Sequence, residues 1–216
     1  MSQEHLPSWA TELANSILLA VKSKDPFTFY HCCRVGRQAR RLAKSMGLTK
    51  HEQNVLEYSG LFHDIGKIGI PDSILLKPDR LVQDELKIMK SHPIKSAEMI
   101  ESLIHIPFFR FVLPGIRCHH ERFDGSGYPF GLVAERIPLP ARIIAVVDTV
   151  DAMTNSRPYR KALSLEHTLQ ELKDCSGSQF DPNIVNAYLD SKVYQQLGTI
   201  DGNEEVVVPA VLKKAA

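Results

Sequence analysis

Five histidines and two aspartates in this chain have the side chains and the placement expected of transition-metal ligands. They are His31, His63, Asp64, His92, His119, His120 and Asp148. Imidazole and carboxylate together suit Fe and Mn, and also Zn. Seven ligands are too many for one ion and fit two ions that share a bridging carboxylate. Two such ions, about 3.5–4 Å apart, can activate a hydroxide and hold a phosphoryl group, so the pattern predicts phosphodiester hydrolysis.

Each of these residues also has an ordinary explanation when it is taken alone. His31 lies four residues before Val35 on the inward face of an expected helix, where a single histidine is usually a hydrogen-bonded core residue. The dipeptide His63-Asp64 is weak evidence by itself. Asp148 interrupts the apolar run IIAVVDTV, and a carboxylate buried there needs a partner or a cation. The seven residues together favour a shared metal centre, and no Walker loop, Rossmann glycine pattern or serine nucleophile set competes with it.

The composition is that of an ordinary globular domain. The chain has 216 residues, 44% hydrophobic and 24% charged, enough for one domain with a sizeable core and at most a small appendage. A net charge of +1 gives no support for binding a nucleic-acid polymer or a membrane surface, although a small anion needs only a few local cations. The N-terminus lacks a basic region and a long apolar run, and the cysteines form no CxxC pair. We therefore expect a cytoplasmic protein.

Helical periodicity dominates the elements that must position the ligands. Residues 31–46 place apolar side chains on one face and end at Gly47, which predicts a helix. Thr49 and Glu52 form a capping box for a second helix that runs towards His63. The basic residues of the first helix are expected on its solvated face: Arg34, Arg37, Arg40, Arg41 and Lys44.

Prolines and glycines divide the rest of the chain. A break at Pro93 separates two expected helices, because proline disrupts a helix interior. Ser164 and Asp181 are expected to cap helices. The further helices are expected over residues 83–91, 94–104, 108–120 and 139–154, with a long loop over 121–138.

We therefore predict an all-α fold, with a single domain of about seven to nine helices. An accessory N-terminal helix is expected within residues 1–25, the main domain over 26–200 and a loosely held tail over 201–216. The sequence does not define an oligomeric state.

Two motifs carry a family resemblance. His63–Lys67, with the sequence HDIGK, resembles the HDxGK core of the HD phosphohydrolase superfamily. His119–Pro129, with the sequence HHERFDGSGYP, resembles the HHExxDGxGYP signature of its HD-GYP subfamily. The similarity continues through Asp148, the segment Arg157–Arg160 and Gln179–Pro182, and covers about residues 25–190.

The resemblance implies an HD-type helical domain that acts as a cyclic di-GMP phosphodiesterase. By similarity, His31, His63, Asp64 and Asp148 bind one metal ion, and Asp64, His92, His119 and His120 bind the other, with Asp64 bridging. Attack of a metal-bridging hydroxide then opens the ring to linear pGpG. Some family members hold a third metal through a glutamate at the position of Phe27. This departure implies two metals, Fe or Mn, and slow further hydrolysis to GMP.

The resemblance also implies supporting residues. Lys67 is expected to neutralise a phosphate oxygen or to aid proton transfer. Arg157 and Arg160 are expected to bind phosphate, with Arg160 at a position that is often lysine. Asp151, three residues after Asp148, is expected to order a metal ligand, a water or Lys67. In the loop, Tyr128 is expected to contact the dinucleotide and Gly127 and Pro129 to shape its binding surface. Glu121 and Asp124 are expected to have structural roles.

Two alternatives remain open at this stage. The domain could be a signalling module that binds a cyclic dinucleotide and a protein partner through the GYP loop, with little turnover. It could also hydrolyse a hybrid cyclic GMP-AMP dinucleotide, because the bases are not distinguished by these motifs.

Overall fold

The computed structural model describes residues 8–156 and 161–196. Within these ranges the structure is all-α, without a strand, and the only β-type pairing is an isolated bridge between Ser176 and Phe180. The helices are α1 (Ser8–Lys24), α2 (Pro26–Ser45), α3 (Lys50–Phe62), α4 (Asp72–Leu75), α5 (Gln83–Met89), α6 (His92–Glu101), α7 (Pro107–Arg117), α8 (Leu139–Thr154), α9 (Leu165–Asp174) and α10 (Pro182–Ser191). Three 3₁₀ turns are η1 (Ile65–Gly69), η2 (Ala134–Arg136) and η3 (Val193–Gln196).

The predicted fold class is confirmed. Nine of the described helices have seven residues or more, and α4 is a single turn of four residues. None of the helices in the described ranges is both long and apolar enough to span a membrane. The predicted tail over 201–216 lies outside the described residues.

Local capping explains where several helices begin and end. The Thr49 hydroxyl accepts from the Glu52 backbone, and the Glu52 carboxylate accepts from the Thr49 backbone, so the predicted capping box is confirmed. Ser164 and Asp181 cap α9 and α10 as predicted. Gly47 has φ +75°, and the bond from the Leu48 N–H to the Ala43 carbonyl closes α2 in a Schellman arrangement.

Pro93 has a different role from the one predicted. It lies in the first turn of α6, which begins at His92, and not in the break between two helices. Proline is tolerated there because the first N–H groups of a helix have no intrahelical acceptor. The break instead falls between Met89, where α5 ends, and His92. His92 therefore starts a helix.

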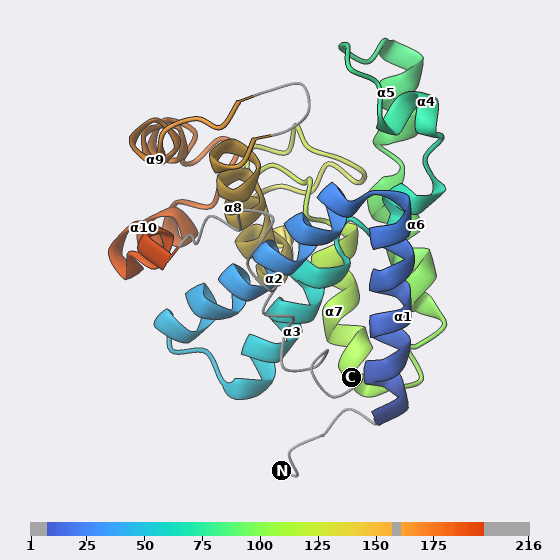
Figure 1. Cartoon of the computed structure of the whole chain (residues 1–216). Coiled ribbons are helices and arrows are strands. Elements are labelled where there is room, and N and C mark those ends of the chain that lie inside the picture. The colour runs from blue at the N-terminus through green and yellow to red at the C-terminus, as the bar shows by residue number, and fades with distance from the viewer. Residues whose placement is uncertain (1–7, 157–160, 197–216) are drawn as a thin grey trace.

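Two large apolar clusters build most of the core, and α2 and α3 contribute to both. One cluster joins them to α1, α6 and α7, and the other joins them to α8, α9 and α10. Figure 1 shows α2 and α3 between these two groups of helices. Ala10, Ala14, Leu18 and Val21 bury one side of α1 in the first cluster. The helix expected within residues 1–25 is thus packed on the main body, while the domain division at residue 25 stays a prediction.

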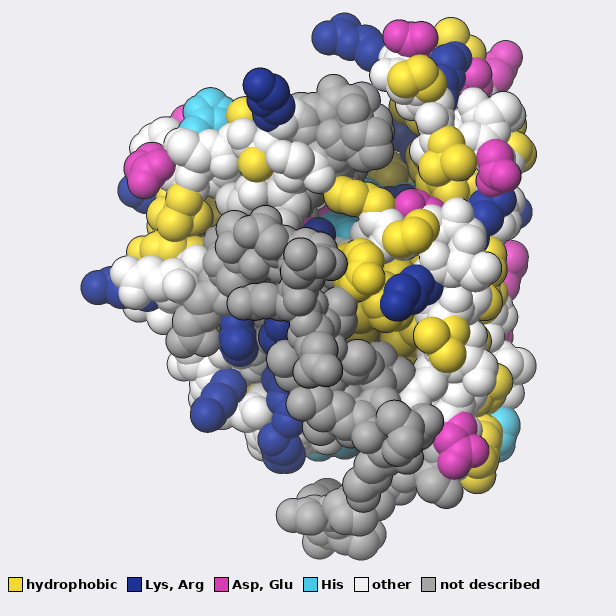
Figure 2. Space-filling view, in the orientation of Figure 1, with side chains coloured by type: hydrophobic (Ala, Val, Ile, Leu, Met, Phe, Trp, Pro, Cys, Tyr) yellow, Lys and Arg dark blue, Asp and Glu magenta, His cyan; other side chains and the backbone are white. Residues whose placement is uncertain are grey.

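The basic residues of α2 do not all lie on a solvated face. Arg40 forms an ion pair with Glu57 of α3, which is only 6% exposed, and Arg34 turns towards α8. Lys44 is exposed as expected. Figure 2 shows Lys and Arg side chains gathered where α2 lies in Figure 1, so part of the predicted face is present. The prediction was wrong for Arg34 and Arg40 because α2 is central, and buried carboxylates on its neighbours need cations.

A pair of glycines lets α2 and α3 approach closely. A Cβ atom on Gly60 would lie 2.6 Å from the Cα atom of Gly36, and a Cβ atom on Gly36 would lie 2.7 Å from the Glu57 carbonyl oxygen. Contacts this short are not seen for real Cβ atoms, so the helix crossing depends on both residues lacking a side chain.

We predict that Gly60→Ala destabilises the fold by about 1–3 kcal/mol, because the helices must separate to admit the methyl group. Urea denaturation measures the change in the free energy of unfolding. Gly69→Ala is the matched control, since its Cβ atom would meet only the Lys95 side chain at 3.5 Å. The control should change stability by less than about 0.5 kcal/mol, and equal effects of the two variants would contradict the crossing argument.

Candidate metal centre

The fold brings all seven predicted ligands together from five parts of the chain. His31 lies on α2, His63 and Asp64 follow α3, His92 begins α6, and Asp148 lies on α8. His119 and His120 lie in the turn after α7, which ends at Arg117, three residues earlier than predicted. Five of the seven residues are at most 2% exposed: His31, His63, Asp64, His92 and His119.

The first group of ligands surrounds one oxygen of Asp64. The Nε2 atom of His31 lies 3.6 Å from Asp64 Oδ2 and 3.0 Å from Asp148 Oδ1. The Nε2 atom of His63 lies 3.4 Å from Asp64 Oδ2 and 3.9 Å from Asp148 Oδ1. Two imidazole nitrogens and two carboxylates thus face one small volume, and they belong to the four residues expected to bind the first ion.

The second group surrounds the other oxygen of Asp64. His92 Nε2 lies 3.0 Å from Asp64 Oδ1, 3.3 Å from His119 Nε2 and 3.2 Å from His120 Nε2. These three imidazoles form a cluster whose ligand atoms lie within 4.8 Å of one another. Asp64 therefore stands between the two groups and presents one oxygen to each, as expected of a bridging carboxylate.

The protonation of the histidines makes these short contacts informative. The Nδ1 atoms of His63, His92 and His119 face backbone carbonyl oxygens of Gly60, Met89 and Ile116 at 2.7, 2.8 and 2.7 Å. A carbonyl oxygen only accepts, so each Nδ1 carries the proton and each Nε2 keeps a lone pair. Lone pairs of His92 and His119 then meet at 3.3 Å. Such a contact repels unless a cation or a proton lies between the atoms.

Two buried atoms of the centre have no hydrogen-bond partner, His63 Nε2 and Asp64 Oδ1. Buried polar atoms without partners are rare because their desolvation is not repaid. Both atoms lie among the facing lone pairs described above. The donor set and these unpartnered atoms fit divalent metal ions, with the Nδ1–carbonyl contacts orienting the ligands.

Burial keeps the imidazoles of His119 and His120 neutral. Burial, together with the neighbouring histidines, holds the pKa of His119 well below its usual value and lowers the pKa of His120 to about 3. Burial opposes ionisation of Asp64, but the Lys67 ammonium, followed by the neighbouring His63 and His92, outweighs it and holds the pKa of Asp64 well below the usual range. Neutral imidazoles around an ionised carboxylate are the forms that bind a metal.

The first group has a different balance. Burial lowers the pKa of His31, but hydrogen bonds to Asp148 and Asp151 outweigh it and raise that pKa to about 9. Burial also opposes ionisation of Asp148, yet the His31 contact holds its pKa far below the usual range. Asp148 therefore stays ionised beside His31.

Asp151 supports the first group from behind. Its Oδ2 atom accepts from His31 Nδ1 at 2.6 Å, and the carboxylate is fully buried. Arg34 donates to both oxygens, at 2.6 and 2.8 Å, and Asn155 donates to Oδ1 at 3.2 Å. Asp151 was expected to order a metal ligand, a water or Lys67. The structure shows the first of these, the candidate ligand His31. Sequence reasoning missed Arg34, although its position three residues after His31 places it on the same side of α2.

Lys67 lies beside the carboxylate that the two groups share. Its Nζ atom is 2.5 Å from Asp64 Oδ2, and its side chain is 19% exposed. The 3₁₀ turn η1 makes this contact, because it turns the chain back directly after the His63-Asp64 pair. The ammonium group is therefore within reach of both the centre and solvent.

The loop after His120 is held by its own polar groups. The buried Glu121 carboxylate accepts from the Phe130 and Leu132 N–H groups at 2.7 and 3.0 Å. Asp124 accepts from the backbone and hydroxyl of Ser126. The predicted structural roles of Glu121 and Asp124 agree with these contacts.

Gly127 and Tyr128 fix the position of this loop against the centre. A Cβ atom on Gly127 would lie 2.3 Å from the backbone nitrogen of Arg122, so only glycine fits. The Tyr128 ring stacks on His120, with centroids 4.8 Å apart, and the Lys90 ammonium lies 5.1 Å from the centroid of the Tyr128 ring. The peptide bond to Pro129 is cis. Tyr128 is thus positioned next to a ligand of the second group.

A cavity of about 310 Å³ opens beside the second group. His119, His120 and Asp148 line it, together with Tyr128 and Gly127 of the loop. Lys90, Arg122 and Gln179 also line it and were not predicted. The predicted phosphate-binding residues Arg157 and Arg160 lie outside the described residues. The cavity joins the candidate metal ligands to a surface large enough for part of a small-molecule ligand.

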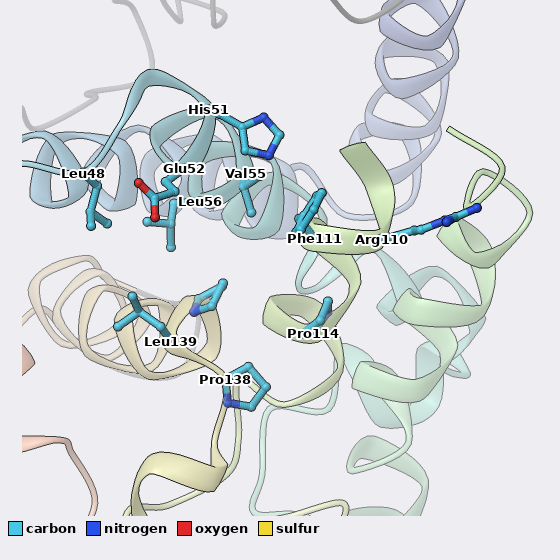
Figure 3. A pocket seen from close by; sticks show the side chains of 11 residues that line it. Leu48, His51, Glu52, Val55, Leu56, Arg110, Phe111, Pro114, Pro138 and Leu139 are labelled. Atoms are coloured by element: carbon cyan, nitrogen blue, oxygen red, sulfur yellow. The ribbon is translucent and has the colours of Figure 1, made fainter. Parts of the chain in front are cut away.

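A second hollow of similar size lies elsewhere and is almost wholly apolar. Figure 3 shows Val55 and Leu56 of α3, Phe111 and Pro114 of α7 and Leu139 of α8 around it. None of the seven candidate ligands lines this groove. The chemistry of the described residues is therefore concentrated at the cavity beside His119 and His120.

Residues 16–184 match the HD domain family, and the chain belongs to this family. It is 40% identical over 181 residues to the cyclic di-GMP phosphodiesterase response regulator RpfG of Xanthomonas campestris, covering 82% of this chain and 47% of that protein. It is 35% identical over 204 residues to 3'3'-cGAMP-specific phosphodiesterase 1 of Vibrio cholerae, covering 94% of this chain and 46% of that protein. The chain thus spans about half the length of these curated relatives.

The fold is also that of a solved HD domain. The HD domain of L. monocytogenes phosphodiesterase PgpH, in complex with cyclic-di-AMP, matches with a TM-score of 0.61 and 18% identity, over 84% of this chain and 95% of that one. At this identity the likeness concerns the fold alone. The family resemblance predicted from the motifs around His63 and His119 is confirmed.

We predict that Asp151→Asn weakens metal binding about 10- to 100-fold, because His31 loses the carboxylate that orients its ring. Titration of the metal-free protein with Mn²⁺, followed by calorimetry, measures the affinity. Asp190→Asn, at an exposed position of α10, is the control and should bind as the wild type does. Unchanged affinity in Asp151→Asn would show that this carboxylate does not support the centre.

Proposed function

We propose that this chain is a metal-dependent phosphodiesterase that hydrolyses cyclic di-GMP to linear pGpG. The observation that carries the proposal is the position of Asp64, whose two carboxylate oxygens face two separate groups of imidazoles. Its Oδ1 atom is buried and has no hydrogen-bond partner. The similarity to RpfG supports the substrate class. Lys67, at 2.5 Å from Asp64, supports catalysis over simple binding.

We propose two divalent metal ions, Fe or Mn, as the cofactors. When bound, they lower the pKa of a water molecule and stabilise the charge that develops on the phosphoryl group. His31, His63, Asp64 and Asp148 would hold one ion, and Asp64, His92, His119 and His120 the other. Phe27 lies beside His31, with ring centroids 6.5 Å apart, and supplies no carboxylate for a third ion. We therefore propose that further hydrolysis to GMP is slow.

The remaining roles follow from charge and position. The Lys67 ammonium offsets negative charge on a phosphate oxygen and holds a proton for the leaving oxygen. Asp151 acts as a positioning residue through His31. Tyr128 packs against a base or sugar from the loop that Gly127 and Pro129 shape. Arg157 and Arg160 are proposed as phosphate-binding residues on the sequence pattern alone. We also propose that the chain works in the cytoplasm.

Two other functions have specific support. The similarity to 3'3'-cGAMP-specific phosphodiesterase 1 favours a hybrid dinucleotide as an alternative substrate. Phe130 and Val133, in the loop after Tyr128, are 54% and 49% exposed. Exposed apolar side chains of this kind favour a contact with a protein partner, in which case the domain would act as a signalling module.

We predict that the metal-loaded chain converts cyclic di-GMP to pGpG, and that Asp64→Ala reduces turnover at least about a thousandfold because both ligand groups lose their shared carboxylate. Product chromatography under reducing conditions, with Fe(II) or Mn(II), measures the rate. Asp79→Ala, at an exposed position, is the control. A wild-type chain that holds both metals and forms no pGpG would exclude the enzyme. Partner binding retained by Asp64→Ala without wild-type turnover would identify a signalling module.

We predict that Lys67→Met lowers kcat about a hundredfold with little change in KM, because the ammonium acts on charge that develops during the reaction. Lys67→Arg should recover part of the rate, since it keeps the charge but changes the geometry. Metal analysis of each variant separates this effect from loss of the ions. Lys87→Met, whose side chain is 70% exposed, is the control. A rise in KM alone would assign Lys67 to binding.

A further inference from the structure

The side-chain amide of Gln179 is held in one orientation at the edge of the cavity. Its backbone is fixed first, because its N–H donates to the Cys175 carbonyl at 3.0 Å and its own carbonyl accepts from Phe123 at 3.2 Å. Its Oε1 atom then accepts from Arg122 Nη1 at 2.8 Å. The backbone carbonyl and the side-chain oxygen of Gln179 are therefore both hydrogen-bonded to the loop that carries Tyr128.

Arg122 is itself fixed by two further contacts. Its Nε donates to the Ser126 hydroxyl at 2.9 Å, and its Nη2 lies 3.3 Å from Asp124 Oδ2. A guanidinium group has donors and no acceptor, so it selects the oxygen end of the Gln179 amide. The amide nitrogen must then point away from Arg122, and it has no acceptor among the described residues.

Gln179 belongs to the same cavity as the candidate metal ligands. Gln179 is half-buried and lines the cavity together with His119, His120 and Asp148. A nucleotide whose phosphate lies at the histidine end of the cavity extends along its walls. The two N–H donors of the Gln179 amide are then available to the part of the nucleotide that lies beside this residue.

We propose that Gln179 reads the purine base and favours guanine over adenine, an inference that rests on the proposed cyclic-dinucleotide substrate. The O6 and N7 atoms of guanine are both acceptors and match an amide N–H donor. Adenine keeps the N7 acceptor but carries an amino group in place of O6, so the donor that would bind O6 of guanine meets another donor. Because Arg122 prevents the amide from flipping, Gln179 cannot present its oxygen to adenine instead.

The test replaces the donors of Gln179 and keeps its shape. In Gln179→Glu the carboxylate still accepts from Arg122 but presents an acceptor to the base. We expect kcat/KM for cyclic di-GMP to fall about tenfold or more, while that for cyclic di-AMP stays the same or rises. Gln179→Met, which has neither donor nor acceptor, should lose the guanine preference without gaining one for adenine.

Binding provides a second readout that does not require turnover. Calorimetric titration of the metal-loaded protein with non-hydrolysable phosphorothioate analogues should show a cyclic di-GMP to cyclic di-AMP preference that Gln179→Glu reduces at least tenfold. Gln195→Glu, the same chemical change at an exposed position of η3, is the matched control. Base-selective binding without cyclic di-GMP hydrolysis would contradict the proposed function and keep this inference. An equal loss for all substrates, an unchanged preference in Gln179→Glu, or no base preference in the wild type would overturn the inference.

Discussion

The structure depends on a set of buried lone pairs that face one another around Asp64. His92 and His119 present unprotonated nitrogens to each other at 3.3 Å, because their Nδ1 protons are committed to backbone carbonyls. A fold without cations would avoid this arrangement, since each lone pair loses its water and gains a repulsive neighbour. The geometry is consistent with a centre that positive ions hold together, and the surrounding helices serve to keep its ligands in place.

The frame achieves this through close packing rather than through long-range charge. Gly36 and Gly60 let α2 and α3 touch, which brings His31 on α2 near the end of α3, where His63 and Asp64 lie. α8 then adds Asp148 at the centre and Asp151 behind His31. Since the candidate ligands come from five parts of the chain, a small shift of any of these helices changes the distances at the centre. The buried contacts behind the ligands restrain such shifts.

The cavity beside the centre is lined by two kinds of groups. In the proposed function, the imidazoles and carboxylates hold the phosphodiester through metal ions and do not distinguish the bases. Arg122, in the loop after His120, holds the side-chain amide of Gln179 in a fixed direction. Relatives of this chain are named for different cyclic dinucleotides. In the two proposals made above, the reaction and the choice of substrate depend on different residues.

The sequence by itself determined the helical class, most of the helix ends and the seven candidate ligands. Capping at Thr49, Ser164 and Asp181 is local, so residue types a few positions apart were enough to predict it. The ligands were found because histidines and aspartates at inward positions carry a cost that only a shared role explains. The break at Pro93 was misplaced, because proline fits both a helix end and a helix start.

Tertiary structure decided the contacts between residues that lie far apart in the sequence. The contact of Arg34 with Asp151 joins residues 117 positions apart, and that of Arg122 with Gln179 joins residues 57 apart. Neither pair has a signal in local spacing, since each depends on which helices pack together. Arg34 was expected in solvent because a basic residue on a helix usually is. Only the central position of α2, enclosed by both clusters of the core, placed it against a buried carboxylate.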